Sequence, residues 1–291
     1  MENNFYKELD MCTKYFKSPM NYIGNKYKLL PQILPLFPTD IDIFVDMFCG
    51  GLDVSLNVDA ENKICNDLEN HLIDFYSNIL SLSGEEVHKK VLEVVEKYNL
   101  SMTNQEGFLK LREDYNKEND WVKFYGLIAH SFNHQLRFNK SGQFNMPFGK
   151  DRSCYNKALQ TRLQEFVNRI DDKYDFYNWD FRKLKFDNLT DRSFVYCDPP
   201  YLITTATYNE NGGWTEDDER DLLDLLDTLN NQGVKFGLSN VYFQNGKSNE
   251  ILGKWMEKYT VHKLDFNYGN SSYHKIDRSK IGTEEVFVCN Y

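Results

Sequence analysis

The 291-residue sequence is 41% hydrophobic and 15% aromatic, which is enough apolar mass for a packed core and excludes a disordered chain. It carries 34 basic and 44 acidic residues, and this net charge of −10 argues, as a total, against a nucleic-acid ligand. The six cysteines form no C-x-x-C pair, and neither a secretion signal nor an 18-residue apolar stretch is present. We therefore expect reduced thiols, a cytoplasmic location and no membrane association.

The charges are distributed unevenly along the chain. Residues 11–30 carry four lysines and no acid, and residues 121–170 carry eight basic and two acidic residues; these are the first and second basic segments. The excess acid lies in residues 31–120, with seven basic and 18 acidic side chains, and in residues 171–230, with six and 15. Such a distribution is compatible with a local nucleic-acid surface, provided that both basic segments lie on one face.

Hydrophobic periodicity predicts the elements of the first half of the chain. They are a strand at 41–48, a short strand at 63–66, helices at 69–82, 84–98 and 121–131, and a hairpin at 135–148 that turns at Ser141-Gly142. Thr103 and Glu106 form a candidate capping box, which predicts a further helix that ends near residue 116.

The second half alternates strands with helices more regularly. The predicted elements are helices at 155–170, 216–230 (capped by Thr215) and 249–258, and strands at 174–179, 194–198, 234–239, 259–266 and 285–289. Strand–helix alternation at both ends of the chain, around a mostly helical middle, predicts an α/β sheet domain with an inserted helical subdomain. We place the sheet domain in residues 1–70 and 168–291, and the insert in residues 71–167.

The strongest chemical signal is Asp198-Pro-Pro-Tyr201, which directly follows a hydrophobic strand. Prolines continue neither strand nor helix, so the chain must turn rigidly at the carboxyl end of the strand, where open α/β sheets bind their ligands. An exocyclic amine suits this turn, because Asp198 and the carbonyl of Pro199 can accept its two hydrogens while Tyr201 stacks on its ring. The alternative is a proline-rich turn without a ligand. In that case the buried Asp198 would have no function, although burying an aspartate costs free energy.

A second signal is Phe48-Cys-Gly50-Gly51, at the end of the first strand. Glycines at such a turn let the backbone approach a ligand closely, although many Gly-Gly turns are only turns. Asp67 ends the next strand, at the place where nucleoside-binding folds hold a ribose hydroxyl pair. Asp67 can also be the N-cap of the following helix, and both roles are compatible.

Together with these motifs, others in the same order resemble a known family. They are Tyr22-Ile-Gly-Asn-Lys26, the segment from His130 to Arg152 with Asn145-Met-Pro147-Phe-Gly, Lys235-Phe-Gly-Leu-Ser-Asn240, and Gly282-Thr-Glu-Glu-Val286. The sequence resembles the amino-group DNA methyltransferases over nearly its whole length, specifically the Dam-type adenine-N6 enzymes and most closely the phage Dam proteins. The resemblance implies a Rossmann-like, S-adenosylmethionine-dependent methyltransferase sheet, with residues 71–167 as the target-recognition subdomain.

The resemblance also assigns residues to S-adenosylmethionine and to the target base. The residues implied for the cofactor are Tyr22, Lys26, Phe48, Gly50, Gly51, Asp67, Asp180, Phe181 and Asp198. The catalytic residues are Asp198 and Pro199, which hold N6 of an adenine flipped out of duplex DNA, and Tyr201, which stacks on it. Direct transfer of the methyl group needs no cysteine nucleophile, so Cys197 is expected to be a packing residue.

The second basic segment resembles the family's target-recognition hairpin. The DNA contacts expected there are Phe132, Asn133, Gln135, Arg137, Asn139, Pro147, Lys150 and Arg152. Arg137 suits a guanine edge, Lys150 or Arg152 a phosphate or a base, and Phe132 or Asn133 the gap left by the flipped base. Phe138 and Phe144 are equally compatible with an ordinary core. The loops at 209–213 and 263–280 are candidates for a lid and a phosphate clamp, or for plain surface loops.

The sequence thus predicts a site-specific DNA adenine-N6 methyltransferase, with GATC as the target that the Dam resemblance suggests. Methylation of cytosine N4 or of RNA is a rival within enzymes, and a DNA-binding relative without catalysis is a rival outside them. An S-P-P-Y box is commoner for cytosine N4, and the intact Asp198, Tyr201 and Asp67 argue against lost catalysis. We expect no metal, because His130 and His134, although four residues apart, lack a nearby acid to complete a site.

Overall fold

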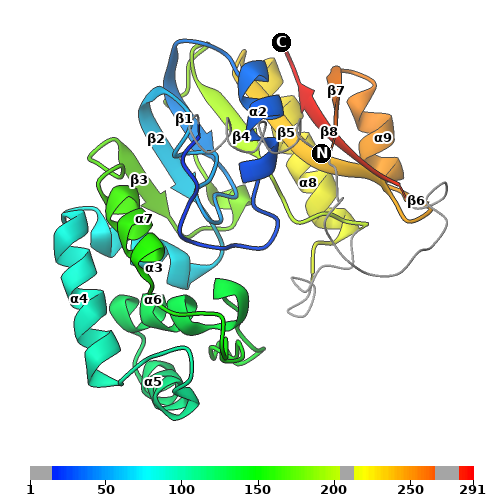
Figure 1. Cartoon of the computed structure of the whole chain (residues 1–291). Coiled ribbons are helices and arrows are strands. Elements are labelled where there is room, and N and C mark those ends of the chain that lie inside the picture. Colours follow the sequence, from blue (N-terminus) through cyan, green and yellow to red (C-terminus); the bar gives the residue numbers. More distant parts are fainter. Residues whose placement is uncertain (1–14, 204–212, 266–281) are drawn as a thin grey trace, which may run out of the picture. The chain divides into compact units, whose positions relative to one another are not determined.

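The computed structural model describes residues 15–203, 213–265 and 282–291 (Figure 1). The chain divides into two compact units. Unit 1 comprises the described part of Met1–Tyr27 with Cys49–Asn57 and Asp67–Asn178, and unit 2 comprises Lys28–Phe48, Val58–Asn66 and the described part of Trp179–Tyr291. Unit 1 takes in the glycine turn as well as the insert. The assignment of residues 71–167 to target recognition stays a prediction.

Unit 2 is built on a mostly parallel sheet. Its strands are β1 (Ile41–Asp46), β2 (Ala60–Asn66), β4 (Phe194–Cys197), β5 (Lys235–Gln244), β6 (Lys247–Ser248), β7 (Thr260–Leu264) and β8 (Thr283–Cys289). The order is β2-β1-β4-β5-β8-β7, with parallel pairing from β2 to β5, antiparallel pairing of β8 with both neighbours, and β6 paired with β5. The predicted α/β class is confirmed.

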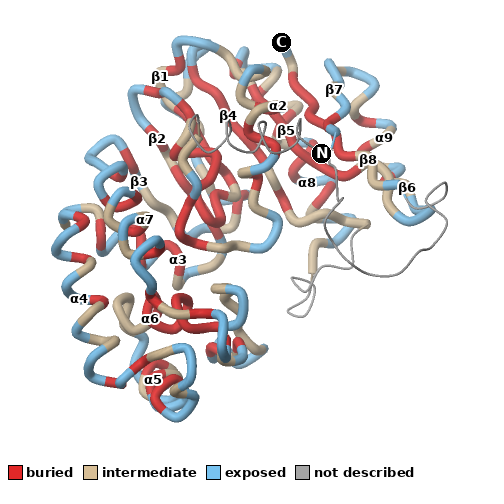
Figure 2. The backbone as a smooth tube through the Cα atoms, in the orientation of Figure 1, coloured by how far each residue is buried: buried red, intermediate tan, exposed pale blue. Residues whose placement is uncertain are grey.

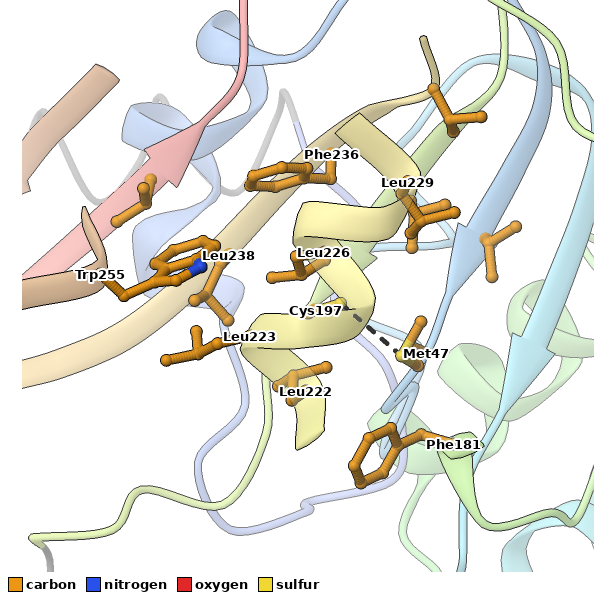
Figure 3. Packing of buried hydrophobic residues seen from close by; sticks show 14 of the residues in the cluster. Met47, Phe181, Cys197, Leu222, Leu223, Leu226, Leu229, Phe236, Leu238 and Trp255 are labelled. Atoms are coloured by element: carbon orange, nitrogen blue, oxygen red, sulfur yellow. Dashed lines mark hydrogen bonds between the residues drawn. The ribbon is translucent and has the colours of Figure 1, made fainter. Parts of the chain in front are cut away.

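The helices of unit 2 cover this sheet. They are α2 (Leu30–Ile33), α8 (Glu216–Asn231) and α9 (Glu250–Met256), with 3-10 turns η1 (Tyr27–Leu29, which begins at the boundary), η2 (Leu34–Leu36) and η4 (Phe181–Lys183). Helix α8 begins with the predicted cap, because Thr215 accepts the amide of Asp218, whose carboxylate accepts the amide of Thr215 in return. Its leucines pack with Val195, Phe236 and Leu238 in the core (Figure 3), and the central strands are buried (Figure 2).

Unit 1 is mostly helical. Its elements are α3 (Asn70–Ile79), α4 (Gly84–Lys97), α5 (Gln105–Lys117), α6 (Trp121–His130), η3 (Phe132–His134), α7 (Lys157–Val167) and strand β3 (Tyr174–Tyr177). Its core is rich in aromatic rings, for example Phe75 stacked on Tyr125 with centroids 5.4 Å apart. The predicted capping box at Thr103 is wrong: Asn104 caps α5, since its carboxamide accepts the amide of Gly107 and donates to the carbonyl of Asn99.

Candidate active site

The glycine turn of unit 1 is shaped so that no side chain fits on it. Gly50 has a φ of +44°, and a Cβ there would lie 2.9 Å from Cδ1 of Tyr22. A Cβ on Gly51 would lie 3.0 Å from the carbonyl oxygen of Met20. The carbonyl of Gly50 accepts the Tyr76 hydroxyl at 2.7 Å, which fixes the turn. The structure thus brings the predicted residue Tyr22 against Gly50, and close packing leaves no room for a side chain at either glycine of the turn.

Asp67 holds the same turn from the other side. Its Oδ2 accepts the amide of Gly50 at 2.8 Å, and its Oδ1 accepts the amide of Glu69 at 2.9 Å. Asp67 is not the N-cap of α3, because Glu69 takes that place by accepting the amide of His71. Burial, only partly offset by these backbone bonds, raises the pKa of Asp67 to about 6. Burial therefore makes the carboxyl group costly to ionise, whereas the two backbone donors orient it and stabilise its ionised form.

Lys26 also belongs to unit 1, and its ammonium group lies beside the backbone. The side chain is 5% exposed, and Nζ donates to the carbonyl of Gly24 at 3.2 Å. The positively charged group is thereby held close to the segment Tyr22–Lys26, which bends at Gly24 with a φ of +81°. This arrangement is compatible with the predicted place of Lys26 beside a ligand carboxylate, which an ammonium pairs with readily.

In unit 2, Asn66 joins the ends of two segments. Its Nδ2 donates to the carbonyls of Met47 and Trp179 at 3.1 and 3.0 Å, and its Oδ1 accepts the amide of Trp179 at 3.0 Å. This fastens the segment that starts η4 to the carboxyl end of β1. Phe181 consequently lies 5.7 Å from Phe48, measured between ring centroids. The two predicted cofactor residues are therefore neighbours.

The carboxylate of Asp180, the residue before Phe181, is engaged in a local network. Its Oδ1 accepts the amide of Arg182 at 2.9 Å, and Arg182 Nη1 lies 3.2 Å from Oδ2. Arg182 also pairs with Asp218 and Asp221, both at 2.6 Å, and these pairs raise the pKa of Arg182 against the effect of its burial. The structure thus assigns Asp180 a role in capping η4, in addition to the ligand contact that the sequence predicts.

The turn Asp198–Tyr201 follows β4, which lies between β1 and β5. The hydroxyl of Tyr201 lies 3.0 Å from Asp198 Oδ1 and 3.1 Å from Glu285 Oε1. It carries one hydrogen, so it donates to one carboxylate at a time. Burial and the two carboxylates raise the pKa of Tyr201 well above its usual value, so the phenol stays protonated. The Tyr201 ring is therefore held by its hydroxyl end.

Cys197 lies directly before this turn and belongs to the core. Its side chain is fully buried, and its Sγ lies 3.8 Å from the sulfur of Met47 (Figure 3). Burial raises the pKa of the Cys197 thiol well above its usual value, which keeps the sulfur protonated and a poor nucleophile. The structure agrees with the prediction that Cys197 is a packing residue.

The hairpin of unit 1 forms around the predicted turn. Phe138 pairs with Phe144, Gly142 has a φ of +72°, and the Asn139 carboxamide accepts the amides of Ser141 and Gln143. The Asn139 side chain is thus used inside the turn. Phe144 is buried and Phe138 stacks on the His71 ring, with centroids 3.9 Å apart and an interplanar angle of 9°. Of the two interpretations left open for these phenylalanines, the structure favours the core.

Arg137 is oriented by its neighbour across the hairpin. Its Nε donates to Asn145 Oδ1 at 2.8 Å, and its Nη2 donates to the Asn145 carbonyl at 3.0 Å. A guanidinium has five N–H donors, so the outer edge formed by Nη1 and the second hydrogen of Nη2 is geometrically suited to a planar acceptor pair. Arg137 is therefore pre-oriented, and Asn145, which the sequence did not single out, orients it.

The loop before the hairpin is conformationally strained. Asn133 and His134 have φ values of +56° and +55°, in the left-handed region that non-glycine residues rarely adopt. The Asn133 carbonyl accepts Asn21 Nδ2 at 2.6 Å, and its carboxamide oxygen accepts Arg152 Nη1 at 3.2 Å. Phe132 is 39% exposed under the Arg152 guanidinium, 4.8 Å from its ring centroid. Two predicted DNA contacts, Phe132 and Arg152, thus form one exposed pair.

Gln135, Pro147 and Lys150 complete the predicted DNA contacts. Gln135 is half-buried, whereas Pro147 and Lys150 are exposed. The carbonyl of Pro147 accepts the amide of Phe132 at 2.8 Å, which ties the end of the hairpin to its beginning. All eight predicted contacts therefore lie on one continuous loop system of unit 1, from residue 132 to residue 152.

The two basic segments meet within unit 1. The bond from Asn21 to Asn133 joins them, and Arg169 of the second lies over the ring of Phe16 in the first, 4.5 Å from its centroid. Lys17 and Arg162, one from each segment, both act on the carboxylate of Asp53. Their described parts are therefore not on opposite faces, as the charge argument required. The predicted loops at 209–213 and 263–280 lie mainly outside the described residues.

Comparison with known proteins shows which family the chain belongs to. Residues 22–269 match the D12 class N6 adenine-specific DNA methyltransferases. The chain belongs to this family. The predicted resemblance to Dam-type adenine-N6 methyltransferases is thereby confirmed.

Individual relatives of this D12-class chain differ in length. It is 43% identical over 282 residues to the type II methyltransferase M.FokI of Planomicrobium okeanokoites and 40% identical over 285 residues to the modification methylase StsI of Streptococcus sanguinis. These alignments cover 95% and 96% of the chain but 43% of each relative, so the chain spans less than half of their length. It is 28% identical over 262 residues to the DNA adenine methylase of Escherichia coli K12, covering 87% of the chain and 88% of that protein.

Three residues that lie next to predicted site residues escaped sequence reasoning. Glu285 was placed in a strand, and nothing in its alternating neighbours indicates that it meets a tyrosine 84 residues earlier. Leu68, directly after Asp67, is 73% exposed. An exposed apolar side chain beside a residue proposed to bind ribose indicates a ligand surface, but the sequence does not show that it is exposed. Trp214 packs against both Phe48 and Phe181, at centroid distances of 5.7 and 5.6 Å.

Within residues 15–203, 213–265 and 282–291, no three His, Cys, Asp or Glu side chains are grouped to hold an ion. Burial lowers the pKa of His130 to about 4, and its Nδ1 donates to the carbonyl of Gly126. No helix in the described part of the chain is both long enough and apolar enough to cross a bilayer.

Proposed function

We propose that the protein transfers a methyl group from S-adenosylmethionine to N6 of adenine in duplex DNA. The observation that carries the proposal is the turn after β4, where the Tyr201 hydroxyl lies against both Asp198 and Glu285 at the carboxyl end of a parallel strand. The family to which the chain belongs supports the reaction class. Because the chain spans less than half of its most similar named relatives, the activity is proposed for this chain by itself.

The residues fit the methyl donor at the glycine turn. The space that a Cβ on Gly50 or Gly51 would take is closed by Tyr22 and Met20, so the turn offers backbone to a close ligand. Asp67 would accept the ribose hydroxyls, and Lys26 would face the amino-acid end. Bound S-adenosylmethionine would supply a methyl group bonded to a positively charged sulfur. When a nucleophile attacks the methyl carbon, the sulfur is the leaving group.

The chain's own part in catalysis is to prepare the nucleophile. The lone pair of adenine N6 is delocalised into the ring, and acceptors for its two hydrogens favour a pyramidal nitrogen with a localised pair. Asp198 and the Pro199 carbonyl supply those acceptors, and Tyr201 stacks on the base. As the new C–N bond forms, the N6 proton passes to Asp198, so no covalent enzyme intermediate is needed.

Two finer features belong to the same proposal. We propose that the adenine is flipped out of the duplex, because its amino group is otherwise hidden in the stack, and that Phe132 fills the gap. A duplex with 2-aminopurine at the target position tests this, since extrusion raises its fluorescence and Phe132→Ala should reduce the rise. We also propose GATC as the recognition sequence, on the Dam resemblance and the pre-oriented Arg137.

A tritiated methyl-transfer assay tests the reaction and its substrate. The substrates are a GATC duplex, a duplex with the same composition but scrambled sequence, and an RNA copy. We expect label in the GATC duplex alone, recovered as N6-methyldeoxyadenosine. Label in cytosine N4 or in RNA would replace the proposed activity, and equal label in both duplexes would refute the recognition sequence.

The variant Asp198→Ala tests the role of the turn. It removes one acceptor of the N6 hydrogens while leaving the hairpin of unit 1 untouched, so we expect the loss of methyl transfer with DNA binding retained. The loss should exceed about 100-fold, the usual contribution of a positioned acid–base group. Turnover within tenfold of the wild-type enzyme would rule out the proposed role.

A further inference from the structure

A buried carboxylate in unit 2 lies outside the turns described so far. Glu219, in the first turn of α8, has no exposed surface. Its Oε2 accepts Trp214 Nε1 at 2.6 Å, and its Oε1 accepts Asn249 Nδ2 at 2.7 Å and Asn240 Nδ2 at 3.1 Å. Removing a carboxylate from water costs free energy unless its lone pairs are satisfied, and here three neutral donors satisfy them.

The three donors come from three different elements. Asn249 caps α9 by accepting the amide of Leu252, and Asn240 lies within β5, next to Ser239, whose hydroxyl bonds Tyr196. These two branches end in the protein interior. Trp214 differs because it stands just before α8 and is only half-buried. The Trp214 branch is therefore the one that leads from the carboxylate to a ring accessible from outside.

Trp214 forms an aromatic cluster with two predicted cofactor residues. Its ring lies 5.7 Å from that of Phe48 at an interplanar angle of 81°, and 5.6 Å from that of Phe181 at 38°. Phe48 and Phe181 belong to unit 2, as Trp214 does, and both are among the residues that the resemblance implies for the cofactor. Partly exposed aromatic faces of this kind suit the planar ring of a purine.

We infer that Glu219 is a positioning residue, which holds the Trp214 indole as one wall of the site for the adenine ring of the methyl donor. The inference rests on the proposed function, since it deepens the assignment of that cofactor to this chain. The physical reason is the fixed direction of an indole N–H: a carboxylate at 2.6 Å selects one ring orientation out of several that the half-buried position permits.

The same helix supplies a matched control. Asp227, two turns further along α8, also accepts an indole, Trp255 Nε1 at 2.8 Å, and it binds the Tyr259 hydroxyl at 2.6 Å. Trp255, however, is buried at 7% exposure in the core, packed against Phe236. A substitution at Asp227 therefore disturbs a similar carboxylate–indole bond on the same helix without touching Trp214.

The test compares binding of S-adenosylhomocysteine to four proteins by titration calorimetry, each checked for folding by circular dichroism. They are the wild type, Glu219→Gln, Trp214→Phe and Asp227→Asn. The amide group of Gln presents hydrogens to one of the N–H donors that the Glu219 carboxylate accepts. Phe keeps an aromatic ring, but it removes the bonded N–H together with part of the indole. Intrinsic fluorescence during the titration reports Trp214, and its change should disappear in Trp214→Phe.

We expect Kd to rise at least tenfold in Glu219→Gln and at least threefold in Trp214→Phe, with kcat at saturating donor reduced less than threefold. Asp227→Asn should lower the midpoint of urea unfolding and keep Kd within twofold. If the wild type fails to bind, the proposed function is wrong. If the wild type binds, the inference is overturned when Trp214→Phe binds equally tightly and its fluorescence response is unchanged. Glu219 would then have a structural role only. This outcome can be read even if Glu219→Gln fails to fold.

Discussion

Lowering the pH should weaken cofactor binding through Asp67. The carboxyl has a pKa of about 6 because it is buried, and in its proposed role only the ionised form would accept both ribose hydroxyls. The rise from the ordinary aspartate pKa of 3.8 corresponds to roughly 3 kcal/mol against ionisation. At pH 5 only about one molecule in eleven carries the ionised group, and the apparent Kd rises by the inverse of that fraction.

Calorimetric titration with S-adenosylhomocysteine from pH 5 to pH 8 measures this effect. We expect a nearly constant Kd above pH 7 and a value about tenfold higher at pH 5, because the binding-competent fraction falls tenfold per pH unit below the pKa. An aspartate with an ordinary pKa would leave Kd almost unchanged over the same range.

The variant Asp67→Asn is the control for this experiment. It removes the ionising group and keeps the side-chain shape, so its binding should be weak at every pH. Any slope that remains belongs to other groups, including Asp53, whose pKa burial raises to about 7. The difference between the wild-type and Asp67→Asn curves of Kd against pH measures the effect of Asp67. Parallel curves would refute the reasoning.

Three further predictions concern unit 1. Because burial raises the folded-state pKa of Asp53 to about 7, its protonated form stabilises the fold at low pH and this contribution is lost as the pH rises through 7. Relative to Asp53→Asn, the wild-type free energy of unfolding should therefore fall by about 4 kcal/mol between pH 4 and pH 8 in urea titrations, and equal pH slopes would contradict this. Arg137→Ala should lose about 1–3 kcal/mol of discrimination at one base pair, measured as kcat/KM on single-substituted duplexes, whereas a uniform loss with a shallower salt dependence would make Arg137 a phosphate contact. His71→Ala removes the ring stacked on Phe138 and should raise KM for DNA up to about tenfold, with His71→Phe restoring it; equal KM values for both variants would show that the stack does not support the hairpin.

Local chemistry explains why some features were predictable. Thr215 and Asp218 are three residues apart, and a capping box needs no partner beyond the first turn of its own helix. The turn at Ser141-Gly142 follows from the freedom of glycine to adopt a positive φ. Even so, Asn104 displaced Thr103 as a cap, because its carboxamide satisfies two backbone groups at once.

Other features depend on which distant residues meet. The hydroxyl of Tyr201 reaches Glu285 only because β8 inserts between β5 and β7 in the sheet. The carboxylate of Glu219 binds donors 21 and 30 residues further along the chain. Hydrophobic periodicity shows that such acids lie on helices or strands. It does not show whether another helix or strand buries them. Burial decides whether a carboxylate needs hydrogen-bond donors around it.

The sequence by itself indicated the family, the order of the strands and helices along the chain, and the two turns that we propose as ligand sites, because these depend on neighbours a few positions apart and on motif order. Tertiary structure alone decided how each acid is used. Asp67, Asp180 and Glu219 are all acidic residues near the ends of elements, yet one faces a glycine amide with a raised pKa, one caps a turn beside Arg182, and one holds an indole. Desolvation and hydrogen-bond geometry make that difference, and both arise only when the chain is folded.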